Sequence, residues 1–509
     1  MLSYFKKESL YSLLELIILF SITILLYFKF EITHNEMDII PYAKSTYYNG
    51  LKPNWYINLQ FPSSFLFNWL LGFFLEGSNP FKIIIIGRII SFLLISYSYR
   101  LLTKALKLNI FLSTMSFFFF LYFFGNGIGD AGEWIVGGLE SKVIAYSFAI
   151  ISLASFLKKR YKTSFLFSGL SLSVHLLVGA YNIFCLIPLL VIIAKSNKNQ
   201  FFMLLKASIY FFITGIIGIS EILSSLTNNT SKEVLERGWD IYVNIRVPHH
   251  LIPDFSTKTW VLLTLLTIVN LYFIKNKETI KKLLAYYALF SVLILLIGLI
   301  IFHFFDSHYL RFYFFRFSDV ILPLISILLL LSTISTVKYI IALAISCFVI
   351  PKSVQKSNIK EIVNKTSYDI NHIKEKTEKD KQMTHWILNN TNENNLFIIP
   401  PENLYFRLNT ERNIFISWWM LPNQQEYKST NTIPQEMIEW YNRLKLLNLN
   451  TDFNNLRDIK NNYTKLDKQS ILDIQSNYTN IKYILTPITM KLDFPIAKQT
   501  DYQLLYLIQ

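Results

Sequence analysis

Long apolar runs alternate with short polar segments along the first two thirds of the chain. A helix that crosses a bilayer needs about 20 mostly apolar residues. The runs that we interpret as spans lie at 13–30, 81–99, 109–124, 141–157, 163–179, 181–194, 207–222, 259–274, 283–302, 320–331 and 339–350. This pattern predicts an α-helical polytopic membrane protein with about 11 transmembrane helices. No small-residue cleavage site follows the first run, so a cleaved signal peptide is not expected.

One apolar run, Phe65–Leu75, is too short to fit this pattern. Its length of about eleven residues is well below that of a spanning helix. We interpret it as an interfacial or re-entrant helix. If it does cross the membrane, the side assigned to every later loop is reversed.

Basic residues gather in the short loops between the apolar runs, as in "KKRYK" at 158–162, "KSNKNQ" at 195–200 and "KNKETIKK" at 275–282. Lys6 and Lys7 precede the first run. Because short cytoplasmic loops are rich in Lys and Arg, these positions predict a cytoplasmic N-terminus. The long loops with unusual polar residues then lie on the extracytoplasmic side, as does the C-terminus.

The composition changes after residue 351, where Asn, Lys, Glu and Thr become frequent and no run of spanning length follows. "NLFIIPP", "NIFISWW" and "IKYILTP" read as strands, and "PQEMIEWYNRLKLL" as an amphipathic helix. We therefore expect two parts, a transmembrane domain at 1–351 and an extracytoplasmic α/β domain at 352–509.

The formal net charge of +15 does not point to nucleic acid. Much of the Lys and Arg lies in loops between spans, and no basic stripe interleaved with aromatic residues is present, so nucleic acid is not an expected partner. Cys185 and Cys347 both fall in apolar segments. We expect packing residues rather than a disulfide, and no Cys/His spacing typical of a metal site occurs.

Directly after the first span, "HNEMD" places Glu36 and Asp38 two residues apart. They share a face of an extended segment but diverge on a helix. A carboxylate held just above the membrane can act as a general base toward a hydroxyl or help to hold a divalent cation, Mg²⁺ or Mn²⁺. A solvated acidic loop is the alternative interpretation.

Further ionisable residues lie at or near the predicted outer ends of other spans. Glu140 and Lys142 in "GGLESK" are either a local ion pair or ligands for sugar hydroxyls and phosphate. His175, with Arg88 and Glu221, lies within or at the end of an apolar run, where ionisable groups usually face the bundle interior or a wet cavity.

Two outer loops combine arginine with histidine or aromatic residues. Prolines stiffen "RVPHHLIPDF", and "HYLRFYFFRFSD" leads into a span. Arginine and histidine suit phosphate oxygens, although arginine among aromatic residues also anchors helices at the interface. The two loops favour an anionic ligand at the outer leaflet, bound by Arg246, His249, His250, Arg311, Arg316 and Asp319.

The chain resembles bacterial members of the GT-C glycosyltransferase superfamily. The resemblance rests on many spans, the acidic first outer loop, and the stretches "GGLESK…AY" at 137–146, "HLLVG" at 175–179, "RVPHHL" and "RFSD". It also includes a tail patterned "WI…FIIPP…FR…R…W".

The resemblance implies an enzyme of the bacterial plasma membrane. It would transfer a sugar, with inversion, from a polyprenyl-phosphate donor to a glycan, lipid or protein acceptor. Asp38 or Glu36 would activate the acceptor, and basic residues would hold the polyprenyl phosphate.

Two other functions remain open at this point. A transporter or flippase of lipid-linked glycans needs the same outer cations, together with polar groups through the full membrane depth. A non-catalytic scaffold would use the tail to bind cell-wall partners.

Overall fold

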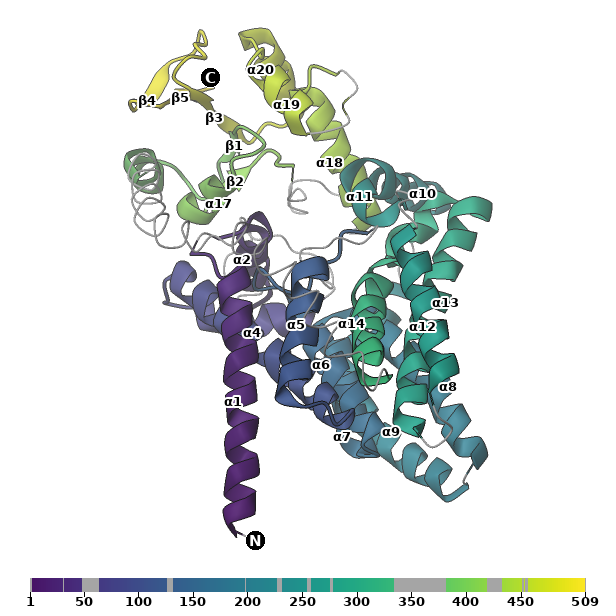
Figure 1. Cartoon of the computed structure of the whole chain (residues 1–509). Coiled ribbons are helices and arrows are strands. Elements are labelled where there is room, and N and C mark those ends of the chain that lie inside the picture. The colour runs from purple at the N-terminus through teal and green to yellow at the C-terminus, as the bar shows by residue number, and fades with distance from the viewer. Residues whose placement is uncertain are drawn as a thin grey trace.

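The computed structural model describes residues 2–30, 32–47, 64–125, 131–196, 198–226, 231–253, 258–274, 278–333, 381–418, 433–450, 453 and 456–508. Most of them lie in helices that form a bundle, and a small sheet with its own helices sits at one end of it (Figure 1). The N-terminus lies at the opposite end (Figure 1). We call the end of the bundle beside the sheet the domain-facing end.

Six helices in the described part of the chain are long and apolar enough to cross a membrane. In α9, Phe212, Ile213 and Ile216 are 59%, 63% and 64% exposed, as expected for side chains that face lipid. The chain therefore has the pattern of a polytopic membrane protein. The six helices are α1 (Leu2–Tyr27), α4 (Pro80–Ala105), α8 (Leu176–Ser196), α9 (Lys198–Leu226), α13 (Thr279–Phe304) and α14 (Arg316–Thr333).

Other predicted spans form apolar helices that are shorter. They are α5 (Ile110–Phe124), α6 (Ser141–Leu157) and α12 (Lys258–Phe273). The predicted span at 163–179 corresponds mainly to α7 (Tyr161–Val174), which is shorter than a spanning helix. The predicted run 339–350 lies outside the described residues. The count of about 11 spans thus stays a prediction. Within the described residues, six helices have both the length and the apolar composition that a membrane span requires.

The helical pair α2 (His34–Tyr47) and α3 (Phe65–Leu75) lies beside the first span. A Cβ atom at Gly72 of α3 would overlap the carbonyl oxygen of Ala43 in α2, so glycine allows the two backbones to touch. The structure confirms a short helix at Phe65–Leu75. Its location at the membrane interface stays a prediction.

The predicted continuous run 163–179 is wrong, because the helix breaks at His175. Residue His175 has extended backbone angles between α7 and α8. Its Nδ1 accepts a hydrogen bond of 3.4 Å from the amide of Val178, which supplies a partner at the start of α8. A Cβ atom at Gly179 would overlap the backbone of Leu172, so glycine lets the first turns of α8 pack against the end of α7.

The segment around "RVPHHLIPDF" is helical. It comprises α10 (Lys232–Ile241), the π-helical turn η1 (Tyr242–Arg246) and α11 (Pro248–Leu251). Proline at the first helical position suits the short helix α11, because its missing N–H would have no partner there. The second arginine-bearing loop forms the 3₁₀ turn η2 (Ser307–Phe312), which ends at Tyr313 with a left-handed backbone (φ 55°).

The C-terminal part is a small α/β unit, as the sequence predicts. Its strands have the order β2-β1-β3-β5-β4, with β1 parallel to β2 and β3, and β5 antiparallel to β3 and β4. The strands are β1 (Leu396–Ile398), β2 (Asn413–Ile414), β3 (Ile481–Pro487), β4 (Ile496–Gln499) and β5 (Gln503–Leu507). The helices are α17 (Leu404–Thr410), α18 (Ile433–Leu447), α19 (Leu456–Tyr463) and α20 (Lys468–Asn477).

Two contacts join this unit to the bundle. Helix α17, which follows β1, lies against α2, where Lys44 Nζ and Glu411 Oε1 are 3.4 Å apart. Helix α10 packs on α18 so closely that a Cβ atom at Gly238 would overlap the backbone of Pro434 (Figure 1). Ile241 of α10 is buried in the same core as the sheet. The predicted boundary at 351/352 lies outside the described residues.

Candidate functional site

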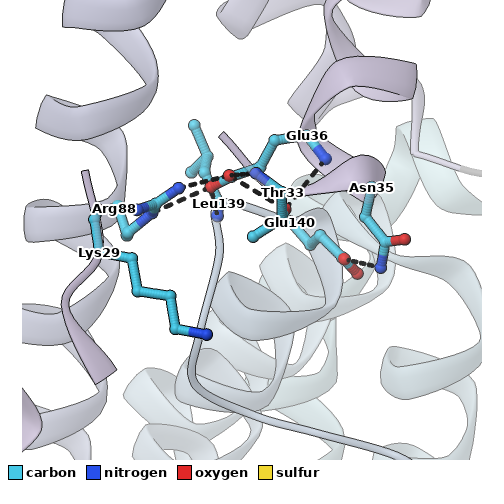
Figure 2. A network of polar contacts seen from close by, with 7 residues as sticks. All are labelled: Lys29, Thr33, Asn35, Glu36, Arg88, Leu139 and Glu140. Atoms are coloured by element: carbon cyan, nitrogen blue, oxygen red, sulfur yellow. Dashed lines mark hydrogen bonds and ion pairs between the residues drawn. The ribbon is translucent and has the colours of Figure 1, made fainter. Parts of the chain in front are cut away.

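Glu36 is fully buried and forms the centre of a hydrogen-bond network (Figure 2). Arg88 of α4 donates to both of its carboxylate oxygens, with Nε 3.1 Å from Oε1. The amide and hydroxyl of Thr33 donate to Oε2 at 2.8 and 3.0 Å, and the amide of Leu139 donates to Oε1 at 2.6 Å. Five donors therefore surround the carboxylate.

The Thr33–Glu36 pair is a capping box at the start of α2. The amide of Glu36 donates back to the Thr33 hydroxyl at 3.3 Å, so each residue satisfies the other's backbone N–H. The pattern T-x-x-E at 33–36 is the sequence signature of this cap, which was not among the features predicted above. Bonded in this way, Glu36 holds α2, α4 and the segment before α6 together.

Asp38 lies in the same helix, but its side chain is outside the part of the chain that the structure describes. Its assignment as a general base therefore stays a prediction.

A second network, which we call the charge cluster, lies at the domain-facing end. It consists of Glu133, Glu140, Lys142 and Arg316. Lys142 Nζ is 3.2 Å from Glu140 Oε2 and 3.5 Å from Glu133 Oε2. Arg316 Nε at the start of α14 is 3.3 Å from the same Glu133 oxygen. Their side chains are 2–18% exposed, and Arg316 is the most exposed of the four.

Aromatic and amide side chains complete this cluster. The Lys142 ammonium lies 4.1 Å from the ring centre of Trp134, and the Arg316 guanidinium lies 4.0 Å from that of Tyr313. Asn35 donates a hydrogen bond of 2.6 Å to Glu140 (Figure 2). Of the two interpretations of Glu140 and Lys142, the ion pair is present, within a larger cluster; their role as ligands for sugar and phosphate stays a prediction.

His250 is bonded to the segment that carries Glu133. Its Nδ1 lies 2.8 Å from the carbonyl oxygen of Ala131. Because a carbonyl can only accept, Nδ1 carries the proton and Nε2 carries the lone pair. Asp319 holds Ala131 in place, because its Oδ2 accepts a hydrogen bond from the Ala131 amide at 2.9 Å. Its Oδ1 accepts a second hydrogen bond from Trp260 Nε1 at 2.8 Å.

Burial and a nearby cation disfavour the charged form of both histidines. Burial, reinforced by the positive charge of Arg316, lowers the pKa of His250 to about 2. Burial and Arg316 also lower the pKa of His249 from its ordinary value. The guanidinium of Arg316 thus acts on both imidazoles of α11.

Arg246 and Arg316 lie on either side of a tyrosine pair. The hydroxyls of Tyr242 and Tyr313 are in hydrogen-bond contact. Burial raises the pKa of Tyr313 well above its ordinary value, while the charges of Arg316 and Arg246 oppose the shift. Arg246 also lies over the ring of Trp440 in α18, 5.2 Å from its centre. Arg246, in the segment between α9 and α12, therefore contacts the C-terminal unit.

The remaining predicted residues make other direct contacts, although the charges of Arg316 and Lys142 also act on His175. Arg311 lies over the rings of Trp239 and Phe312, at 4.8 and 5.0 Å. His175 caps α8, as described above. Glu221 accepts a hydrogen bond of 2.9 Å from the amide of Phe65 at the start of α3.

Residues missed by the sequence analysis are Glu133, Tyr242 and Tyr313. Glu133 stands in "GDAGEWIVGGLESK", four residues before the glycine pair, and nothing in its spacing marks it as a partner of Arg316. Within the described residues, no group of three His, Cys, Asp or Glu side chains comes together as a metal site.

The fold and the two networks define a polytopic membrane protein with charged residues gathered between its helices and a small α/β unit. Residues 378–447 match the family described as a domain of unknown function (DUF6798). The match covers β1, α17, β2 and α18, and it ends before β3. No curated protein matches the chain.

Proposed function

We propose that the protein is a membrane glycosyltransferase that moves a sugar from a polyprenyl-phosphate donor to an acceptor outside the cytoplasm. One observation carries this proposal: Lys142 of α6 and Arg316 of α14 meet at the same carboxylate, Glu133. Two cations from different helices are thus held together at the domain-facing end, with Arg316 18% exposed.

The chemistry of the transfer calls for such an arrangement. When the anomeric carbon leaves the lipid phosphate, negative charge grows on the phosphate oxygens. Fixed cations stabilise that charge most effectively where water is scarce, because little reorganisation is needed during the reaction. Arginine also presents a planar fork that matches phosphate oxygens. In this proposal, the phosphate takes the place of Glu133 as partner of Arg316 and Lys142.

The position of the cluster suits a lipid-linked donor. It lies at the ends of α6 and α14, so an isoprenoid tail can remain among the apolar helix faces while its phosphate reaches the cations. The α/β unit stands over the same end, and Arg246 connects the two through Trp440. An acceptor would approach between them.

The proposal is tested with purified protein in proteoliposomes and polyprenyl phosphates that carry a radiolabelled hexose or pentose. Arg316→Gln and Lys142→Gln each remove a charge-assisted partner worth about 1.5–3 kcal/mol, so the KM for the donor should rise roughly ten- to hundredfold. Lys232→Gln is the matched control, because Lys232 lies on the same side of the protein and its side chain is 88% exposed. Absence of labelled product with the unsubstituted protein contradicts the proposal.

A transporter or flippase of lipid-linked glycans is a second candidate, which a different observation favours. Polar contacts continue away from the domain-facing end between α1, α4 and α5. Thr23 contacts Ser96 at 3.2 Å, and the Tyr99 hydroxyl donates to Ser116 at 2.6 Å. Arg100 and Glu15 then form a buried pair at 3.6 Å. Movement of the labelled lipid across the membrane without sugar transfer would support this candidate.

A further inference from the structure

We infer that His250 is the general base of the proposed transfer and accepts the proton of the acceptor hydroxyl on Nε2. The inference rests on the proposed function and adds the identity of the base to it. A general base needs a lone pair at a fixed position beside the reacting groups. The geometry of α11 provides both features.

Hydrogen bonds fix the tautomer and the position of the ring. Nδ1–H donates to the carbonyl of Ala131 at 2.8 Å, which leaves the lone pair on Nε2. Asp319 accepts a hydrogen bond from the amide of Ala131. Ala131, whose carbonyl orients His250, is therefore itself held in place by Asp319. Within the described part of the chain, no hydrogen bond engages Nε2 of His250.

The backbone that carries His250 is equally constrained. Pro248 begins α11, and the amide of Ile252 donates to the Pro248 carbonyl at 2.8 Å. The next side chain, Leu251, is fully buried in the bundle core. His250 is therefore attached to an anchored turn and remains partly exposed.

Among the carboxylates that the structure describes at this end, Glu36, Glu133 and Glu140 are less suited to the role, because each is already bonded to donors or cations. Glu36 accepts five hydrogen bonds, two of them from Arg88. Glu133 lies against both Arg316 and Lys142, and Glu140 lies against Lys142. These contacts already occupy carboxylate oxygens that a general base would need for the acceptor hydroxyl.

The charges that face His250 make its basicity depend on the donor. They come from Arg316 on α14 and Lys142 on α6, and the ring of His249 on α11 lies beside the ring of His250, 4.0 Å between centres. Together with burial, they hold the pKa of the imidazole at about 2. A donor phosphate bound to Arg316 and Lys142 would neutralise these charges. The pKa of His250 would then rise, and the ring would become an effective base only in the complex.

The proposed step balances as follows. The acceptor oxygen forms a bond to the anomeric carbon, and the bond from that carbon to the phosphate oxygen breaks. The bonding electron pair leaves with the polyprenyl phosphate, whose charge Arg316 and Lys142 receive. The hydroxyl proton moves to Nε2 of His250 and passes to solvent afterwards.

The test measures release of labelled sugar from polyprenyl-phosphate hexoses and pentoses in proteoliposomes, with water as the simplest acceptor. His250→Asn keeps an N–H that can donate to the Ala131 carbonyl but lacks the basic nitrogen. We expect kcat to fall by about 10²–10⁴-fold, with the KM for the donor changed less than about threefold. His385→Asn, at an exposed histidine of the C-terminal unit, is the matched control and should change neither constant.

A pH profile gives a measurement that does not depend on folding of a variant. At saturating donor, kcat of the unsubstituted protein should fall as pH drops through the raised pKa of His250, because the imidazolium cannot accept a proton. The value of kcat/KM should show no such fall above about pH 4, because it reports the free protein, in which the pKa of His250 is about 2. Added imidazole should also restore part of the turnover of His250→Ala.

Each outcome separates the base assignment from the proposed function. If the unsubstituted protein transfers sugar and His250→Asn keeps more than a third of kcat, the base assignment is overturned and the proposed function stands. If the loss appears only in the KM for the donor, His250 binds the donor and the base assignment is again overturned. If the unsubstituted protein transfers no sugar to water or to any acceptor, both ideas fall.

Discussion

At the scale of single residues, the surroundings of a side chain decide its role more than its position in a motif does. Glu36 stands in the acidic loop where the resemblance expects a base, yet its carboxylate is enclosed by Arg88, Thr33 and Leu139. An ion enclosed in this way is costly to leave without its partner. Glu36 and Arg88 therefore act mainly on stability.

The first prediction concerns this pair. Arg88→Met leaves a buried carboxylate without its cation and should lower the free energy of unfolding by about 3–5 kcal/mol. The double variant Glu36→Met/Arg88→Met should be less destabilised than Arg88→Met, because no buried charge remains. Denaturant unfolding in mild detergent measures both. Lys468→Met, at an exposed pair with Asp493, is the control and should change stability by under about 0.5 kcal/mol.

A second prediction compares two candidate bases. The sequence assigns the base to Asp38, while the geometry assigns it to His250. We expect Asp38→Asn to retain far more turnover than His250→Asn, because the Ala131 carbonyl fixes the tautomer of His250 and the charges of Arg316 and Lys142, which would hold the donor, act on its ring. Single-turnover assays with bound donor measure this. The reverse order, with a 10²–10⁴-fold loss in Asp38→Asn alone, would return the role to Asp38.

At the scale of elements, close packing joins the membrane bundle to the α/β unit. The pattern of apolar residues predicts α18 as an amphipathic helix and β1, β2 and β3 as short apolar strands. It does not predict that α10 shares a core with them. Ile241 packs among the residues of that core, and Gly238 lets the backbones of α10 and α18 meet.

The third prediction tests this contact. Gly238→Val places side-chain atoms where the backbone of Pro434 lies, so α10 and α18 must separate. We expect faster proteolysis of the α/β unit and a lower melting temperature in detergent. Arg237→Ala changes the neighbouring exposed residue of the same helix and is the control. Equal protease resistance of Gly238→Val and the unsubstituted protein would contradict the proposed role of the contact.

At the scale of the whole molecule, the α/β unit lies at one end of the bundle and the N-terminus at the other (Figure 1). Contacts from Arg316 to Tyr313, from Tyr313 to Tyr242 and from Arg246 to Trp440 connect the charge cluster with the α/β unit. If the bundle spans a membrane, these ends face opposite compartments. The basic loops predict that the N-terminal end is cytoplasmic.

The fourth prediction follows from this arrangement. Single cysteines at Lys232 and Lys159, which are both exposed, should react with membrane-impermeant maleimide from opposite sides. In intact cells Lys232→Cys should be labelled, and Lys159→Cys only after the membrane is opened. The background protein should carry Cys185→Ala and Cys347→Ala. Labelling of both positions in intact cells would remove the proposed extracytoplasmic site.

The sequence by itself determined the helical membrane character, the change of composition that marks the α/β unit, and most of its strands. These features follow from local periodicity, which depends on neighbouring residues alone. It also pointed to the residue types of the site, including Lys142, Arg316 and His250.

Only the tertiary structure decided which of these residues meet. Glu133 and Arg316 are far apart in the chain, and their pairing depends on how the segment before α6 meets the start of α14. The same is true of Arg88, which turns Glu36 from a candidate base into a buried anchor. Pairing across helices is set by side-chain packing and by the cost of burying a charge alone, and neither leaves a periodic signal in the sequence.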